Sequence, residues 1–275
     1  MSTQRPESTD AGLEYYRQAE LWSPSGPYGD PAELARADFV ADLALRARPA
    51  RILEVGAGNA MIANRLNERG LEVVAFDQSD VALESVVGPK AIGDIRTMPF
   101  EDRSFDLLIA SQVLEHLPSE TLGRAREELS RVARRHIIVT VPNQEDLVAA
   151  AAVCPECHCR SSPHRHVQSF GRADFTGLCV GFTPESICAF GPVDARPRRL
   201  VALLRRDLME TWDWPPAAIC PQCGYRRGGA DTAERRQPGG ARRLGRLLRV
   251  RRRRWLAAVL TRDSAPASHR SQVAR

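Results

Sequence analysis

The sequence predicts an α/β protein in which a doubly wound, mostly parallel sheet is covered by helices on both faces. Short apolar runs without polar alternation recur between residues 51 and 141, as expected of strands buried on both faces. Segments with helical spacing separate these runs, which is typical of repeated βαβ units. Two C-P-x-C segments further along the chain predict a small metal-binding insertion beside the sheet.

The first elements precede the sheet. A short helical candidate covers residues 13–22, and a longer helix is expected from Pro31, with Asp30 as its cap. Five strands are expected at residues 51–55, 71–76, 91–92, 105–110 and 136–141. The helices between them are expected at residues 59–69, 79–86 and 118–134.

The alternation of predicted strands and helices ends after Asn143. A helix is expected at residues 170–180, a strand at 186–190 and an amphipathic helix at 198–211. We therefore divide the chain into three parts. They are an N-terminal arm and substrate cap (1–30), a domain (31–225) that includes metal knuckles at 154–166 and 220–224, and a basic, partly disordered tail (226–275).

The net charge of +5 is unevenly distributed. Residues 226–275 hold 15 arginines against three acidic residues, which gives +12, so the other 225 residues carry −7. Residues 241–256 combine arginines with apolar residues at helical spacing. We expect a peripheral contact with an anionic membrane surface or RNA, or else a solvated tail.

The chain is expected to lie in the cytoplasm, with a peripheral membrane contact as one option. No apolar run approaches the roughly 20 residues that cross a bilayer, so no transmembrane segment is expected. The first ten residues are polar and lack the apolar stretch of a signal peptide.

A glycine loop follows the first strand of the sheet. Gly56 and Gly58 let a ligand approach the backbone at the carboxyl edge of the sheet. A dinucleotide fingerprint would need a third glycine where Met61 stands, so that ligand class is disfavoured. Glu54 suits a cation, such as an amino group or a sulfonium, better than a pyrophosphate.

Two further carboxylates follow neighbouring strands. Asp77 ends the second strand, where it can accept hydrogen bonds from ribose hydroxyls. Asp94 follows the third strand and can reach an adenine amino group, with the backbone of Ile95 nearby. Together these residues fit a ligand with adenine, ribose and a cationic amino-acid tail.

These motifs resemble the class I S-adenosylmethionine-dependent methyltransferases, in particular small-molecule enzymes that carry a V-L-E-H-L motif after the fourth strand (here residues 113–117). The resemblance implies a Rossmann-like sheet with an antiparallel last strand and S-adenosylmethionine as cosubstrate. It also implies that Glu54, Gly56 and Gly58 hold the methionine part, Asp77 the ribose, and Asp94 with Ile95 the adenine. Ala60 departs from the pattern, because many members have a third glycine there.

The sequence predicts the residues near the methyl acceptor less specifically than those near the cosubstrate. His116 lies just beyond the fourth strand and could act as a general base, but packing or capping is an equal alternative. Glu115 is no better placed by the sequence. Many methyl transfers need only proximity and in-line geometry, because the sulfonium is already reactive.

Four cysteines predict a structural zinc site. Cys154 and Cys157, and then Cys220 and Cys223, each form a C-P-x-C knuckle that can contribute two thiolates to a Cys₄ site. The resemblance extends to methyltransferases with a split zinc ribbon after the fifth strand. A local site made with Cys159 and His164 or His166 is the alternative, and we expect Cys179 and Cys188 to be core residues.

The sequence therefore predicts an enzyme that methylates a small-molecule or lipid- or sugar-linked acceptor. An RNA methyltransferase that uses the zinc ribbon and the basic tail is an alternative, although no base-grasping motif follows the fourth strand. A catalytically silent binding module is a third, which the intact Glu54, Asp77 and Asp94 disfavour.

Overall fold

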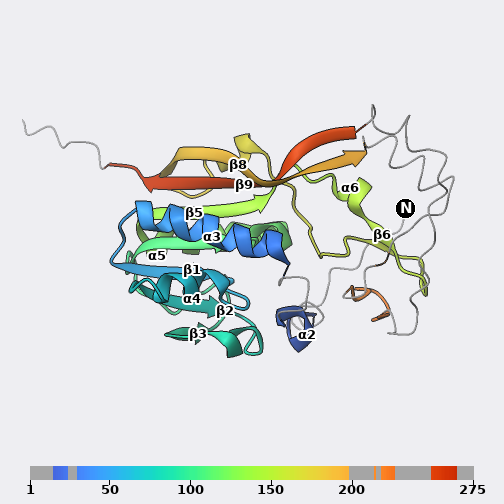
Figure 1. The fold of residues 1–275 in the computed structure, drawn as a ribbon, viewed down its shortest axis with the longest axis horizontal. Coiled ribbons are helices and arrows are strands. Elements are labelled where there is room, and N and C mark those ends of the chain that lie inside the picture. Colours follow the sequence, from blue (N-terminus) through green and yellow to red (C-terminus); the bar gives the residue numbers. More distant parts are fainter. Residues whose placement is uncertain (1–14, 24–29, 198–213, 215–217, 227–248, 265–275) are drawn as a thin grey trace, which may run out of the picture.

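A seven-stranded sheet forms the body of the protein. The structure, a computed structural model, describes residues 15–23, 30–197, 214, 218–226 and 249–264. The strands lie in the order β3-β2-β1-β4-β5-β9-β8, with helices packed against the sheet (Figure 1). The predicted doubly wound α/β class is confirmed. A small second sheet pairs β6 (Ala152–Val153) with β7 (Arg160–Ser161).

All five strands predicted from apolar runs are present and parallel to one another. They are β1 (Arg51–Val55), β2 (Glu72–Asp77), β3 (Lys90–Ile92), β4 (Phe105–Ser111) and β5 (Ala133–Pro142). Strand β1 pairs with β2 on one side and with β4 on the other. The strand order therefore reverses between β1 and β4, and the crevice outside the carboxyl ends at such a reversal is where these sheets bind ligands.

The helices are shorter than the sequence predicts, except for the first long one. Helix α3 (Pro31–Arg46) begins where expected, and Asp30 caps it by accepting from the backbone N–H of Ala32 at 2.5 Å. The other helical elements are α2 (Ala19–Trp22), α4 (Met61–Asn67), η2 (Ala82–Ser85), η3 (Leu114–His116), α5 (Ser119–Val132), α6 (Leu147–Ala150) and η4 (Arg172–Phe175). Among the described residues, no helix has the length and apolar character needed to cross a bilayer.

The arginine-rich tail contributes a strand to the sheet, which corrects two expectations. Residues 249–256 do not form the expected helix, and the domain does not end at residue 225. Strand β9 (Arg249–Arg262) lies between β5 and β8 (Phe182–Pro197) and is antiparallel to both. The antiparallel last strand that the resemblance implies is therefore present, but the basic tail supplies it.

Three further expectations concern residues 170–211. The helix expected at residues 170–180 is wrong, because only the single turn η4 forms there, and Gly177 and Gly181 have left-handed backbones (φ 71° and 74°) that end any helix. Cys179 is buried as expected, whereas Cys188 is exposed. The helix expected at residues 198–211 lies outside the described residues.

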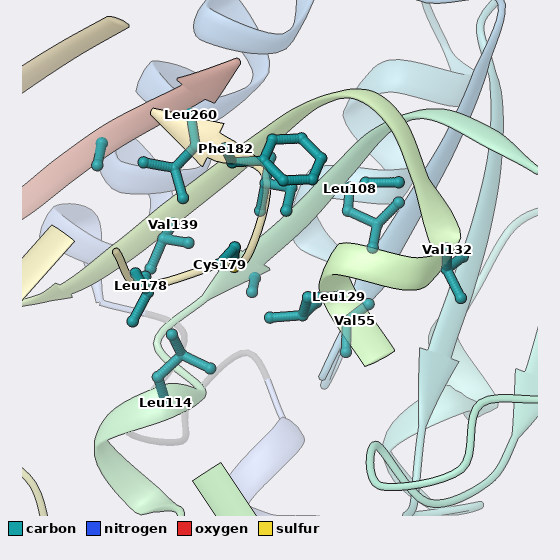
Figure 2. Packing of buried hydrophobic residues seen from close by; sticks show 14 of the residues in the cluster. Val55, Leu108, Leu114, Leu129, Val132, Val139, Leu178, Cys179, Phe182 and Leu260 are labelled. Carbon is teal, nitrogen blue, oxygen red and sulfur yellow. The ribbon is translucent and has the colours of Figure 1, made fainter. Parts of the chain in front are cut away.

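Two apolar clusters cover the two faces of the sheet. One packs the residues of β4 and β5 that point to one side against α5 and against residues 175–182, with Leu260 of β9 beside Phe182 (Figure 2). The other packs the opposite side of the same strands against α3 and α4. Alternate residues of β1 and β4 divide between the two clusters, which explains why these strands are apolar at almost every position.

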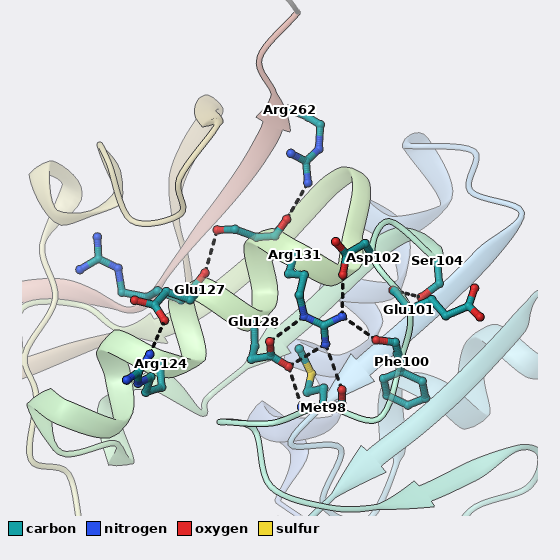
Figure 3. A network of polar contacts seen from close by, with 12 residues as sticks. Met98, Phe100, Glu101, Asp102, Ser104, Arg124, Glu127, Glu128, Arg131 and Arg262 are labelled. Carbon is teal, nitrogen blue, oxygen red and sulfur yellow. Dashed lines mark hydrogen bonds and ion pairs between the residues drawn. The ribbon is translucent and has the colours of Figure 1, made fainter.

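A polar network fixes the loop before β4 to helix α5 (Figure 3). Arg131 donates to the backbone carbonyls of Met98 at 3.0 Å and Phe100 at 2.6 Å. It also forms ion pairs with Glu128 and Asp102 at 2.7 and 2.9 Å. The start of β4 is thereby held in register with the helix that covers it.

Candidate functional site

The glycine loop needs both of its glycines. Gly56 and Gly58 have left-handed backbones, with φ of 67° and 53°. A Cβ at Gly56 would lie 2.4 Å from Val113, and a Cβ at Gly58 would lie 2.6 Å from Trp22. Ala60 is also left-handed (φ 54°), a backbone conformation that favours glycine.

Two buried carboxylates hold this loop. Glu54 accepts a hydrogen bond from the backbone N–H of Ala63 at 2.8 Å, in the first turn of α4. Asp77 accepts from the backbone N–H groups of Gly58 and Ser79, both at 2.9 Å. Burial raises the pKa of Glu54 to about 8 and also raises that of Asp77. The structure thus brings Glu54, Asp77 and the glycines together at one edge of the sheet.

Asp94 and Ile95 lie beside this group but contribute differently. The backbone N–H of Gly93 donates to the carbonyl of Asp77 at 3.0 Å, which ties the end of β2 to the Asp94 segment. The Asp94 carboxylate is engaged by Arg96 at 2.5 Å, and this hydrogen bond lowers its pKa. Ile95 packs against the apolar cluster on the α5 side of the sheet.

The described part of the N-terminal arm lies over the same edge. The carbonyl of Tyr16 accepts from Ser79 Oγ at 2.8 Å and from the Trp22 indole N–H at 2.9 Å. The Tyr16 ring meets the His116 ring edge-on, with centroids 5.9 Å apart. Residues 15–23 therefore bridge the glycine loop and the predicted acceptor side.

His116 lies in η3, just past β4, as predicted. Burial lowers its pKa well below the usual range for histidine. Its Nδ1 is buried and has no hydrogen-bond partner among the described residues. Glu115 and His166 lie beside it, and Glu145 contacts His166. The position of His116 after β4 is visible in the sequence, whereas its contact with His166, 50 positions away, arises only from the tertiary fold.

The two C-P-x-C knuckles come together although 62 residues separate them. The Sγ atoms of Cys154 and Cys223 lie 3.6 Å apart, and those of Cys157 and Cys220 lie 3.5 Å apart. All four Sγ atoms lie within 4.8 Å of one another. Four soft thiolate donors at this spacing fit a tetrahedral zinc ion.

The knuckles share one backbone pattern. In the first, the N–H of His158 donates to the carbonyl of Cys154 at 3.0 Å, and in the second, Gly224 donates to Cys220 at the same distance. His158 and Gly224 both have left-handed backbones, with φ of 58° and 73°. Cys159 lies 3.3 Å from Cys220 by its Sγ, but it is not one of the four mutually close thiols.

Part of this chain is similar in sequence to known methyltransferases. A family described as "Methyltransferase domain" matches residues 53–139. An uncharacterized methyltransferase of Mycobacterium tuberculosis is 33% identical over 98 residues, which cover 34% of this chain and 39% of that protein. The chain thus matches about two fifths of the length of this curated relative.

Solved structures match more of the chain at lower identity. A SAM-dependent methyltransferase from Archaeoglobus fulgidus is 14% identical with a TM-score of 0.52, covering 86% of this chain and 96% of that one. The magnesium protoporphyrin IX methyltransferase of Synechocystis, solved with bound SAH, is 12% identical with a TM-score of 0.51, covering 94% and 95%. Likenesses at this identity establish the fold.

Residues 53–139 thus match a methyltransferase domain, and the sheet has an α/β fold that solved methyltransferases share. More narrowly, this part of the chain is similar to the class I S-adenosylmethionine-dependent methyltransferases.

Proposed function

We propose that the protein transfers the methyl group of S-adenosylmethionine to a small-molecule or lipid- or sugar-linked acceptor. The acceptor nucleophile attacks the methyl carbon in line with the carbon–sulfur bond. That bond breaks with its electron pair going to sulfur, so S-adenosylhomocysteine leaves and the acceptor loses its proton, where it has one, to a base or to water. The observation that carries the proposal is the meeting of Glu54 and Asp77 at the glycine loop.

Each polar residue has a proposed role. Glu54 faces the cationic amino-acid part of the cosubstrate with Gly56 and Gly58, since a buried carboxylate gains most from a nearby positive charge. Asp77 accepts from the ribose hydroxyls with the lone pairs that Gly58 and Ser79 leave free. Asp94 and Ile95 bind adenine, which requires that Asp94 share its carboxylate between Arg96 and the base.

Calorimetry of S-adenosylmethionine binding tests the pocket. Hydrogen bonds to a charged group contribute about 1.5–3 kcal/mol each, so losing two from Asp77 should weaken binding by about 100-fold or more. We expect this for Asp77→Ala. The matched control is Glu72→Ala, at the exposed opposite end of the same strand. Unchanged affinity in Asp77→Ala would refute the assignment.

We also propose that Cys154, Cys157, Cys220 and Cys223 hold one structural zinc ion. Four protein thiolates would fill the coordination sphere and leave no position for a reacting water, so zinc here would stabilise the fold. Elemental analysis should find one zinc per chain, lost in Cys223→Ser and retained in the control Cys188→Ser, whose exposed thiol lies on β8. Folded protein without zinc would contradict this.

The role of His116 as general base stays a prediction. Its Nδ1 has no hydrogen-bond partner among the described residues, and such a lone pair can accept a proton or bind a metal ion.

We propose that the arginines of residues 241–256 bind an anionic surface from the cytoplasm. In the described part, Arg249 and Arg251 to Arg253 are exposed on β9, where the strand pairs with β8 alone. Binding to anionic vesicles should weaken steeply with salt. Preferential binding of RNA at equal salt would favour the alternative of an RNA methyltransferase, and failure to form S-adenosylhomocysteine with any cell extract would favour the silent module.

A further inference from the structure

A second cluster of possible metal ligands lies apart from the four cysteines. Glu115, His116 and His166 each present one ligand atom, and these three atoms lie within 4.8 Å of one another. Glu115 and His116 come from η3 at the end of β4, and His166 comes from the segment that follows the first cysteine knuckle. We call these three residues the Glu–His cluster.

Glu115 is the least explained residue of the cluster. Its side chain is fully buried, and neither carboxylate oxygen has a hydrogen-bond partner among the described residues. Burying a carboxylate without a partner costs several kcal/mol, so native proteins nearly always pair such a group with a cation or with donors. A buried carboxylate without a partner, next to two imidazoles, is therefore typical of a cation-binding site.

Both imidazoles have one nitrogen engaged and the other available. The Nδ1–H of His166 donates to Glu145 Oε2, which leaves the lone pair on Nε2. The Arg165 backbone acts on the His116 ring and opposes the lowering of its pKa by burial, while His116 Nδ1 has no partner among the described residues. A carboxylate behind one imidazole nitrogen is the usual way in which proteins orient a histidine that binds metal through the other nitrogen.

The backbone holds the cluster in place. The carbonyl of Glu115 accepts from the N–H groups of Val167 and Gln168, at 2.8 and 3.0 Å. The N–H of His166 donates to Ser162 Oγ at 3.1 Å. These bonds fix the His166 segment against η3, and the two imidazole centroids lie 4.8 Å apart. These contacts therefore hold the segments that carry the three side chains next to one another.

We propose that the Glu–His cluster binds one divalent transition-metal cation through the Glu115 carboxylate, His116 Nδ1 and His166 Nε2. Two imidazoles and one carboxylate suit zinc, manganese, cobalt or iron. Three protein ligands leave coordination positions open, which distinguishes this site from the four-thiolate site. Glu145 is a positioning residue that orients His166.

The place of the cluster indicates what fills the open positions. Val113, two residues before Glu115, lies against Gly56 of the cofactor loop, and Tyr16 of the arm lies against His116. If methyl transfer occurs as proposed, the cluster lies on the acceptor side. An acceptor hydroxyl oxygen would then occupy an open position, where the cation lowers the pKa of that hydroxyl. This last step rests on the proposed function, whereas metal binding does not.

Manganese titration of protein that holds one equivalent of zinc tests the site, because that zinc occupies the four thiolates, and Mn²⁺ prefers carboxylate and imidazole to thiolates. Electron paramagnetic resonance of free Mn²⁺ should reveal one bound manganese ion per chain, with Co²⁺ as a second probe. Glu115→Gln and His166→Gln should weaken binding at least tenfold, and Glu145→Gln by about 10- to 100-fold. The control is His164→Gln, which should bind as the wild type does, because His164 is not a member of the cluster although its ring lies 5.7 Å from that of His166.

Thermal unfolding provides an independent reading. Manganese should raise the midpoint of the wild type and of His164→Gln, but not of Glu115→Gln or His166→Gln, since only a ligand of the folded state stabilises it. Zinc content and circular dichroism verify that each variant is folded.

Two results would overturn the proposal. One is a wild-type protein that takes up neither Mn²⁺ nor Co²⁺ beyond its zinc, and the other is a folded Glu115→Gln or His166→Gln variant with wild-type affinity. The titration contains neither cosubstrate nor acceptor. It can therefore fail while S-adenosylmethionine still binds, or succeed when that binding fails.

Discussion

Replacing Leu260 with alanine tests whether the arginine-rich segment belongs to the folded domain. Leu260 lies in β9, is fully buried, and is paired with Ile137 of β5. It packs in the same apolar cluster as Phe182 (Figure 2). A solvated tail would place this side chain in water, and the substitution would then have almost no effect.

The expected loss follows from the burial. The substitution removes three carbon groups, and about 0.8 kcal/mol for each gives about 2.4 kcal/mol of lost transfer free energy. Neighbouring strands cannot collapse fully into the space, so a cavity term raises the total to about 2.5–4 kcal/mol. At about 2–4 °C per kcal/mol for a domain of this size, the melting midpoint should fall by about 5–15 °C.

Urea unfolding monitored by circular dichroism measures this loss. The matched control is Val193→Ala on β8, the strand that pairs with β9, where the side chain is 48% exposed. The control should lose less than about 1 kcal/mol. If Leu260→Ala lost no more than Val193→Ala, β9 would not be a strand of the sheet and the predicted tail would be correct.

Three further predictions follow from the site and its supports. Burial raises the pKa of Glu54 to about 8, so Glu54 must lose a proton before it can pair with the cationic cosubstrate. The affinity for the cosubstrate should therefore rise about tenfold per pH unit from pH 6 to 8 and then level off. Calorimetry measures this dependence, and Glu54→Gln should not show it. The same shift stabilises the free protein below about pH 4.5, and this stabilisation is lost as the pH rises through about 8. Gly58→Ala should weaken cosubstrate binding, because it combines a left-handed backbone with a Cβ 2.6 Å from Trp22, and Trp22→Ala should relieve part of the loss in a double-mutant cycle. In urea unfolding, Arg131→Ala should lose about 1–3 kcal/mol, whereas Arg124→Ala, which removes an exposed pair, should change stability by less than about 0.5 kcal/mol (Figure 3).

The βαβ part of the fold could be predicted because its information is local. Each strand is mainly apolar, all but β4 end at or just before a glycine, an aspartate or a proline, and Asp30 with Pro31 marks the start of α3. The glycine loop with its acidic neighbour could be predicted for the same reason, since Glu54, Gly56 and Gly58 lie within five residues.

The sequence did not predict strand β9, because its many arginines favour a solvated basic segment. The spacing of apolar residues at 244, 247, 248 and 255 suggests a helix, yet residues 255–260 form an unbroken apolar run of strand length. Such a run is typical of a strand buried on both faces, and it was the available evidence for the correct fold. The Glu–His cluster could not be predicted in the same way, because His166 reaches Glu115 only through the tertiary fold.

The place of β9 in the sheet has a consequence for biosynthesis. Within the described part of the chain, strand β8 has β9 as its only neighbour in the sheet, and the outer edge of β5 is covered by β9 as well. During translation both edges stay unpaired until residues 249–262 have left the ribosome, so the growing chain exposes strands that can pair with other chains. The segment made after every proposed cofactor and metal ligand thus decides whether the nascent domain closes or aggregates.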